Sequence, residues 1–411
     1  MRYLAVLGRQ PEISIAELEA LLPLAKIFKV VERGDSANIC FIDGLKAFPV
    51  NIRRLGGVLK LAVKIEEKPL DYLRKLPEGK ITIGISDYSS KASKKTAMTE
   101  ALKLKKILAR NGRSVRVIEN KEAVLSTATS LHNGLSGKNE RKVEFIKVDG
   151  DWFRVIGVQD IDTYTERDRV RPARDSKVGM LPPKLAQILI NLCGNLKPGS
   201  LILDPFCGTG VVLQEALLMG YRVYGTDVNE RMVEYSEKNL EWLSESRFNS
   251  FEGMFAAVEP TTAERVPRKD GWASGLEKEM NRDLASKYLI QKGDATSFQW
   301  EQPVDAVACE GYLGKPFSKI PTDMEVKEQK QECQAIVLGS LKNLSKQIKI
   351  GTPVTIAVPS WLRENGEYLR LDILDEIGKL GYNVNNKTYE GLLYHRERQV
   401  VARDILILRK K

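Results

Sequence analysis

The sequence predicts an α/β protein in which two small α+β units precede a doubly wound, seven-stranded sheet that closes with an antiparallel hairpin. Three observations predict this fold class. The first 65 residues contain apolar segments in the order β-α-β-β-α-β, the pattern of a ferredoxin-like unit. From Lys184 onward, helical and strand segments alternate regularly, as in a parallel sheet covered by helices. The apolar run 201–204 then passes from Asp204 into a glycine-bearing turn, which is typical of a buried strand that opens onto a site.

The N-terminal elements follow from apolar runs separated by polar breaks. We expect a helix over 13–22 that opens at Ser14, a short helix near 46–54, and four strands at 2–7, 27–31, 37–42 and 58–65. A second small unit contains a basic helix, a helix at 126–135, and strands at 81–88, 114–119, 142–148 and 152–160. We assign 1–66 to a ferredoxin-like domain and 67–158 to a second α+β domain.

Residues 159–180 carry many arginines, two X-Pro breaks and no apolar periodicity, and we interpret them as a linker. The domain with the doubly wound sheet is expected over 181–411. Its predicted strands are 201–204, 221–227, 287–293, 304–309 and 353–359, with a long helix at 325–349 and a hairpin around 395–399. Residues 245–283 are polar and unperiodic, and we interpret most of them as a mobile surface insertion.

The composition limits the classes of protein to which this chain can belong. The chain has 411 residues, a net charge of +10 and 43% hydrophobic residues, so we expect several globular domains and a polyanionic partner. It contains no apolar run of 18 residues and no signal-peptide pattern, and we therefore expect a cytoplasmic protein without membrane association. Five scattered cysteines without a CxxC pair, together with only His132 and His395, argue against a metal site and a disulfide framework.

The turn after 201–204 does not fit a phosphate-binding loop. Asp204 stands where a pyrophosphate would lie, the P-loop lysine is missing, and Leu213 replaces the third glycine of the dinucleotide fingerprint. A ligand with an ammonium and a sulfonium suits the acid better, and S-adenosylmethionine is such a ligand. Asp227 ends the next strand, where it can accept ribose hydroxyls, and Asp294 follows the third strand, where it can accept the adenine amino group.

These positions define the predicted cofactor site, whose alternative interpretation is a set of turn acids in an unrelated α/β fold. The predicted cofactor-binding residues are Asp204, Phe206, Gly208, Gly210, Asp227, Asp294 and Ala295.

The same motifs carry a family resemblance. DPFCGTG and GDAT, together with the stretches 7–22 and 162–192, resemble the archaeal and eukaryotic tRNA guanine-10 N2-methyltransferases. The resemblance implies a ferredoxin-like unit, a THUMP domain that binds RNA, and a Rossmann-like class I methyltransferase domain. It also implies S-adenosylmethionine as the cofactor and tRNA, or another structured RNA, as the partner. A small activator subunit is a further partner to consider.

The family's catalytic D-P-P-Y motif is altered in this chain, which has Glu310, Gly311, Tyr312 and Leu313 after the fourth strand. In the family pattern, the acid and a proline carbonyl accept hydrogen bonds from the amino group, and the aromatic ring stacks on the base. The resemblance therefore assigns Glu310 and Tyr312 as the catalytic residues. Glu310 is one methylene longer than Asp, and Gly311 loosens a turn that prolines would fix.

A basic helix near 94–113 is the main candidate for RNA binding. Ala97, Ala101, Leu104 and Leu108 share one face, and basic residues occupy another. A solvated surface helix is the alternative, but the charge density favours nucleic acid. The linker arginines either form salt bridges with neighbouring acids or contact RNA. The predicted RNA-binding residues are Lys94, Lys95, Lys103, Lys106, Arg110, Arg167, Arg169, Arg171 and Arg174.

We therefore predict methylation of N2 of a guanine in tRNA. The alternatives are methylation of adenine N6 or cytosine N4 in rRNA or DNA, and a catalytically weak RNA-binding relative; a small-molecule substrate would leave the basic N-terminal half unexplained. Trp361 and Tyr394 are more often core aromatics than base-stacking groups, and Cys207 and Cys309 are expected to be small buried thiols. The sequence does not specify the modified position, the number of methyl groups added or the oligomeric state.

Overall fold

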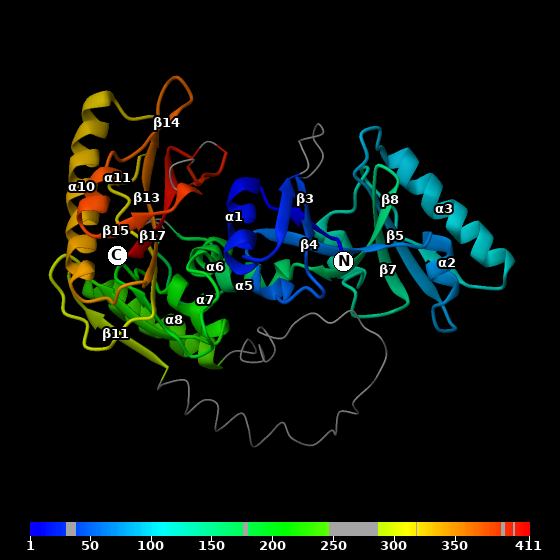
Figure 1. Cartoon of the computed structure of the whole chain (residues 1–411), viewed down its shortest axis with the longest axis horizontal. Coiled ribbons are helices and arrows are strands. Elements are labelled where there is room, and N and C mark those ends of the chain that lie inside the picture. The colour runs from blue at the N-terminus through cyan, green and yellow to red at the C-terminus, as the bar shows by residue number, and fades with distance from the viewer. Residues whose placement is uncertain (30–37, 176–179, 246–286, 318, 388–390, 398) are drawn as a thin grey trace, which may run out of the picture. The chain divides into compact units, whose positions relative to one another are not determined.

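The computed structural model in Figure 1 describes residues 1–29, 38–175, 180–245, 287–317, 319–387, 391–397 and 399–411. The insertion predicted at 245–283 lies outside these residues, except for Glu245. The described chain forms two compact units, one from Met1 to Tyr164 and the other from Thr165 to Lys411.

The first unit is built on one mixed sheet of eight strands, in the order β2-β3-β1-β4-β8-β7-β5-β6. The half formed by β1 to β4 has the predicted ferredoxin-like strand order, and β4 pairs with β8 of the second predicted domain. The elements of this unit are β1 (Tyr3–Leu7), α1 (Pro11–Leu21), β2 (Lys26–Lys29), β3 (Ile39–Asp43), η1 (Ile52–Arg54), β4 (Val58–Ile65), α2 (Pro69–Arg74), β5 (Ile81–Asp87), α3 (Lys94–Arg110), β6 (Val115–Val117), α4 (Thr127–His132), β7 (Lys142–Val148) and β8 (Asp151–Val158).

The basic helix α3 has the predicted apolar face. Ala97, Ala101, Leu104 and Leu108 are buried, and they pack in one core with side chains of β5, β6 and β7. Ser93 caps the helix through a reciprocal pair of hydrogen bonds with Thr96, and this pairing fixes where the helix begins.

Three local predictions in or next to this unit were wrong. Helix α1 begins at Pro11 instead of Ser14, because a proline at the first helical position needs no hydrogen-bond acceptor for its nitrogen. The short helix near 46–54 is only the 3₁₀ turn η1. The linker contains a helix, α5 (Ile161–Arg169). Its buried positions are Tyr164 and Arg167, three residues apart, so an arginine takes a position where apolar periodicity would be sought.

The second unit has the predicted doubly wound sheet. Seven strands follow the order β11-β10-β9-β12-β13-β17-β15, while β14 pairs with β13 and β16 with β17. The sheet is parallel from β11 to β13, and β17 is antiparallel to β13. The elements are α6 (Pro183–Leu192), β9 (Leu201–Asp204), α7 (Val211–Leu218), β10 (Arg222–Asp227), α8 (Glu230–Glu245), β11 (Tyr288–Lys292), β12 (Ala306–Glu310), α10 (Asp323–Ser345), β13 (Pro353–Leu362), β14 (Tyr368–Leu369), α11 (Leu374–Lys379), β15 (Tyr382–Val384), β16 (Leu393–Tyr394) and β17 (Val401–Lys410).

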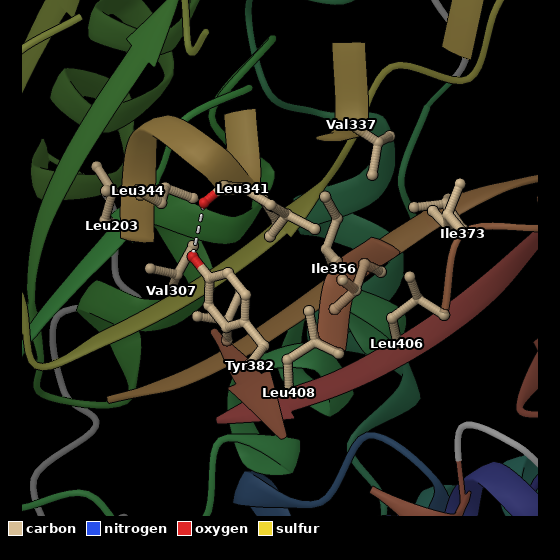
Figure 2. Close-up of a cluster of buried hydrophobic side chains, with 14 of the residues drawn as sticks. Leu203, Val307, Val337, Leu341, Leu344, Ile356, Ile373, Tyr382, Leu406 and Leu408 are labelled. Atoms are coloured by element: carbon tan, nitrogen blue, oxygen red, sulfur yellow. Dashed lines mark hydrogen bonds between the residues drawn. The ribbon is translucent and has the colours of Figure 1, made fainter. Parts of the chain in front are cut away.

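Helices cover both faces of this sheet. Helices α10 and α11 lie on one face, and α6, α7 and α8 lie on the other (Figure 1). Figure 2 shows the core beneath α10, where Val337, Leu341 and Leu344 meet strand residues including Ile356 and Leu406. The hydroxyl of Tyr382 donates to the carbonyl of Leu341 at 2.9 Å, which satisfies a polar group inside this apolar layer (Figure 2).

The closing hairpin is present, since β16 and β17 pair antiparallel, with Tyr394 opposite Arg403. Within the described part of the chain, no helix combines the length and the apolar character that crossing a membrane requires.

Candidate functional site

A cavity of about 1180 Å³ lies at the carboxyl ends of β9, β10 and β12 in the second unit. The strand order reverses at this edge, because β10 and β12 both pair with β9. Open α/β sheets bind ligands at such a point, since the loops on either side diverge. The fold therefore places a cavity where the sequence predicts a binding site.

Asp204 ends β9 and is 1% exposed. Its Oδ1 accepts a hydrogen bond of 3.1 Å from the backbone N–H of Phe206, which turns the chain away from the strand. Burial raises the pKa of Asp204 well above its usual range, and the nearby carboxylates of Asp227 and Glu310 raise it further. A cationic ligand beside this group would favour its charged form.

The turn that follows depends on two glycines with positive φ, Gly208 at 52° and Gly210 at 77°. Gly208 lines the cavity. Gly210 does not line the cavity; it is the N-cap residue directly before α7, and a Cβ there would lie 2.9 Å from Ser236 Oγ. A glycine at this position permits close packing of the turn against α8, and the cofactor-binding role of Gly210 stays a prediction.

Asp227 ends β10 and holds the glycine turn in place. Its Oδ2 accepts from the N–H of Gly208 at 3.0 Å, and its Oδ1 accepts from the N–H of Asn229 at 2.9 Å. Burial raises the pKa of Asp227, although both of these hydrogen bonds act in the opposite direction. The carboxylate therefore joins two of the loops that line the cavity.

The third predicted acid, Asp294, follows β11 and is exposed. Its Oδ1 accepts from the N–H of Thr296 at 2.8 Å and from the Thr296 hydroxyl at 2.7 Å. The adjacent Ala295 is buried, and its carbonyl accepts from the Asn343 side chain. Asp294 and Ala295 both line the cavity, together with Asp204, Phe206, Asp227, Glu310 and Tyr312.

The altered catalytic motif follows β12 without a proline turn. The N–H of Gly311 donates to the carbonyl of Ala357 at 2.9 Å, which continues the pairing with β13 by one residue. The Tyr312 ring packs against the core, and its hydroxyl donates to Glu332 at 3.2 Å. Desolvation and the neighbouring Glu332 raise the pKa of Tyr312, so this hydroxyl stays protonated at neutral pH.

A residue that the sequence analysis missed completes the site. Nε of Arg403 on β17 donates a hydrogen bond to Oε1 of Glu310. The Arg403 side chain is 5% exposed and that of Glu310 is 15% exposed, and both residues line the cavity. The only sequence signal was a pair of charged residues, Arg403 and Asp404, within an apolar strand.

The aromatic and thiol candidates lie in positions typical of core side chains. Trp361 is fully buried in the core of the second unit. Cys207 and Cys309 are buried, and burial raises the pKa of both thiols. Tyr394 is half-buried in the short strand β16.

The predicted RNA-binding residues fall into two groups. Lys95, Lys103, Lys106 and Arg110 are exposed on α3, as is Lys94, which lies 3.2 Å from Glu119. In and after α5, Arg169 and Arg174 are exposed.

The other two arginines of this segment are buried, which corrects their predicted role. Nε of Arg167 lies 2.7 Å from Oε1 of the buried Glu215 on α7. Arg171 is 2% exposed, and burial lowers its pKa. Neither guanidinium is accessible to an RNA phosphate, so we remove both from the RNA-contacting set.

Comparisons with known proteins agree with the fold and the motifs. Residues 171–264 match the family described as "RMKL-like, methyltransferase domain". The tRNA (guanine(10)-N2)-dimethyltransferase of Methanothermobacter thermautotrophicus is 56% identical over 63 residues, which cover 15% of this chain and 18% of that protein. The protein of the same name from Methanocaldococcus jannaschii is 28% identical over 247 residues, covering 57% and 69% of the two chains. The family resemblance predicted from the motifs is thereby confirmed.

A solved structure, that of TrmN from Thermus thermophilus, aligns over the whole of both chains with 17% identity and a TM-score of 0.46. This chain spans less than a fifth of the length of the relative from Methanothermobacter thermautotrophicus.

Proposed function

We propose that this chain is an S-adenosylmethionine-dependent RNA methyltransferase that methylates N2 of a guanine in tRNA. One observation carries the proposal. Carboxylates from the ends of three adjacent strands of the sheet, Asp204, Asp227 and Glu310, line one cavity at the switch point. The named relatives support the choice of substrate.

The residues present fit the methyl donor. S-adenosylmethionine carries an ammonium and a sulfonium, and the cavity is lined by carboxylates, among which that of Asp204 is buried. Asp204 would face the cationic part, Asp227 the ribose hydroxyls and Asp294 the adenine amino group. When bound, the donor supplies an electrophilic methyl group.

Glu310 and Tyr312 would act on the acceptor base. The amine lone pair of guanine is delocalised into the ring, so a hydrogen bond from the amine to Glu310 orients it toward the methyl group. The Tyr312 ring lines the cavity and offers a stacking surface. As the N–C bond forms and the S–C bond breaks, the amine loses one proton, and Glu310 or water can accept it.

The first unit would bind the RNA together with two arginines at the start of the second unit. We assign 1–66 as the ferredoxin-like domain, 67–158 as a THUMP-like RNA-binding domain, 159–180 as the connecting segment and 181–411 as the methyltransferase domain. Exposed lysines on α3, together with Arg169 and Arg174, would contact phosphates, which position an RNA without reading its sequence. The guanine would reach the cavity by extrusion from its stack. We place the enzyme in the cytoplasm and leave a small activator subunit as a possible partner.

The test is to incubate the purified protein with tritiated S-adenosylmethionine and unmodified tRNA, digest the RNA and identify the labelled nucleoside. We expect labelled N2-methylguanosine or its dimethyl form. Glu310→Gln should lower the rate about 100- to 1000-fold, because it removes the charged acceptor beside the reacting amine.

Calorimetry with S-adenosylhomocysteine is the control, and Glu310→Gln should retain its affinity for this product. Label in N6-methyladenosine or N4-methylcytidine would show that the enzyme methylates the amino group of adenine or cytosine and not that of guanine. Binding of tRNA without transfer of a methyl group to any RNA would instead indicate an RNA-binding protein.

A further inference from the structure

The ion pair between Arg403 and Glu310 joins two strands that are not neighbours. Glu310 is the last residue of β12, Arg403 is the third residue of β17, and β13 lies between these strands. β17 runs antiparallel, so its first residues reach the edge at which the parallel strands end. The pair therefore lies at the wall of the cavity, on the side away from Asp227.

Glu310 needs an external restraint. In the D-P-P-Y pattern, a shorter side chain is followed by two prolines that fix the backbone. Here a glutamate has one more rotatable bond than an aspartate, so fixing its carboxylate costs more conformational entropy. The backbone of Gly311 is held by its hydrogen bond to Ala357, but that bond does not orient the Glu310 carboxylate.

Arg403 is well placed to supply that restraint. It belongs to the longest ladder of the sheet, in which β13 and β17 pair from Pro353–Arg409 to Trp361–Val401. Its side chain is almost fully buried, so the guanidinium has few alternative positions. A guanidinium has a planar fork of donors, which fixes the orientation of a carboxylate better than a lysine ammonium does.

Several carboxylates line the cavity, so a nearby cation would reduce the repulsion among them. Asp204, Asp227 and Glu310 line it, and the lining side chains that the structure describes include two cations, Lys315 and Arg403. Lys315 is exposed, whereas Arg403 is buried against Glu310. A buried cation offsets the repulsion among these carboxylates more effectively than a solvated one.

We infer that Arg403 is a positioning residue that holds the Glu310 carboxylate toward the reacting amine, in place of the prolines missing from the motif. This inference rests on the proposed function, because the amine is the expected partner of Glu310. Arg403 acts through Glu310 and needs no contact with the substrate.

A double-mutant cycle tests the inference through Arg403→Met, Glu310→Gln and the double variant. Arg403→Met should lower kcat about 10- to 100-fold and change KM for donor and tRNA less than about twofold, since it disturbs orientation and not binding. Arg403→Lys should recover part of the loss. In the Glu310→Gln background, Arg403→Met should change kcat less than about twofold.

Arg409→Met is the matched control, because Arg409 lies exposed on the same strand, and it should leave kcat unchanged. Affinity for S-adenosylhomocysteine verifies that each variant is folded. Two results would overturn the inference. One is a wild-type kcat for Arg403→Met, and the other is the same fold-loss of kcat from Arg403→Met in the wild-type and the Glu310→Gln backgrounds.

Crystal structures give a readout that does not depend on turnover. In Arg403→Met the Glu310 carboxylate should leave its position at the cavity, and in Arg403→Lys it should remain. If wild-type protein transfers no methyl group to tRNA, the proposed function fails, and these structures still decide the role of Arg403. Glu310 unmoved in Arg403→Met would contradict it.

Discussion

Each of the two sheets carries a buried ion pair that connects strands separated by a third. In the first unit, Lys60 on β4 pairs with Glu144 on β7, and β8 lies between them. In the second unit, Arg403 on β17 pairs with Glu310 on β12, and β13 lies between them. The two pairs share this construction but differ in their surroundings.

The pair in the first unit is sealed. The side chains of Lys60 and Glu144 are 1% and 0% exposed, and the Lys60 ammonium also donates to the carbonyl of Leu125 at 2.7 Å. The Ser86 hydroxyl donates to Glu144 at 2.7 Å. The pair in the second unit lies at the strand ends and lines a cavity. A sealed pair can only specify the fold, whereas a pair that borders a cavity can also present a charge to a ligand.

The largest effect should come from breaking the sealed pair. Lys60→Met leaves the carboxylate of Glu144 buried without its cation, which should destabilise the protein by about 3–5 kcal/mol. Urea unfolding measures this loss. Affinity for S-adenosylhomocysteine, measured where the variant is folded, should not change because the cavity belongs to the second unit.

The double variant Lys60→Met with Glu144→Leu is the control for this experiment. Because it removes both charges, it should recover most of the stability. A Lys60→Met protein as stable as wild type would show that the sealed pair is not structural.

Asp404 is a further buried acid, and its Oδ1 has no hydrogen-bond partner among the described residues. This residue lies beside Arg403 in the sequence, and its Oδ2 is 3.7 Å from Nε of Arg370. Burial raises the pKa of Asp404 from 3.8 to about 6, although Arg370 acts in the opposite direction.

This shift makes stability depend on pH. The folded state binds the proton of Asp404 more tightly than the unfolded state, so stability falls as the pH rises from about 4 to about 6. The full cost is about 3 kcal/mol at neutral pH. Asp404→Asn should therefore be more stable than wild type at pH 7.5 by up to about 3 kcal/mol, and equally stable at pH 4.

Urea unfolding at several pH values measures the difference. Asp372→Asn, at an exposed position, is the control and should keep the wild-type dependence. If Asp404→Asn destabilises the protein equally at both pH values, the side chain has a structural partner that outweighs its burial.

The sequence could predict the acids of the site because parallel strands end at one edge of a sheet. An apolar run that ends in Asp204 or Asp227 therefore gives both the position and the direction of the side chain. Arg403 could not be predicted in this way. It lies 93 residues after Glu310, near the start of an antiparallel strand, and nothing in the local sequence gives the register that brings the two together.

The helices also differ in how well the sequence predicts which of their residues are buried. The apolar spacing of Ala97, Ala101, Leu104 and Leu108 predicts the buried face of α3 correctly. The spacing fails for α5, because the position that an apolar residue would occupy holds Arg167, whose partner Glu215 is on another helix. Periodicity detects faces buried by apolar contact, and it misses those buried through ion pairs.

The smallest effect should come from charges that are neither buried nor paired with each other. Lys103, Lys106 and Arg110 are exposed on α3, and the opposite face of that helix supplies its packing, so they can be changed without loss of the core. Changing all three to Gln should weaken tRNA binding at low salt about 10-fold, or about 1.4 kcal/mol. For every phosphate that the variant no longer neutralises, the slope of log affinity against log salt should also fall by about 0.7–0.9.

Filter binding at several salt concentrations measures both quantities. The matched control changes Lys342, Lys346 and Lys349 to Gln; these residues are exposed before β13, at the opposite edge of the sheet from the cavity. Both triple variants lose the same net charge, so a general electrostatic attraction would weaken binding equally in the two. A loss confined to the α3 variant, with its salt slope reduced, would indicate direct phosphate binding by this helix. Equal losses would show that α3 contributes only to the overall field and does not bind phosphates directly.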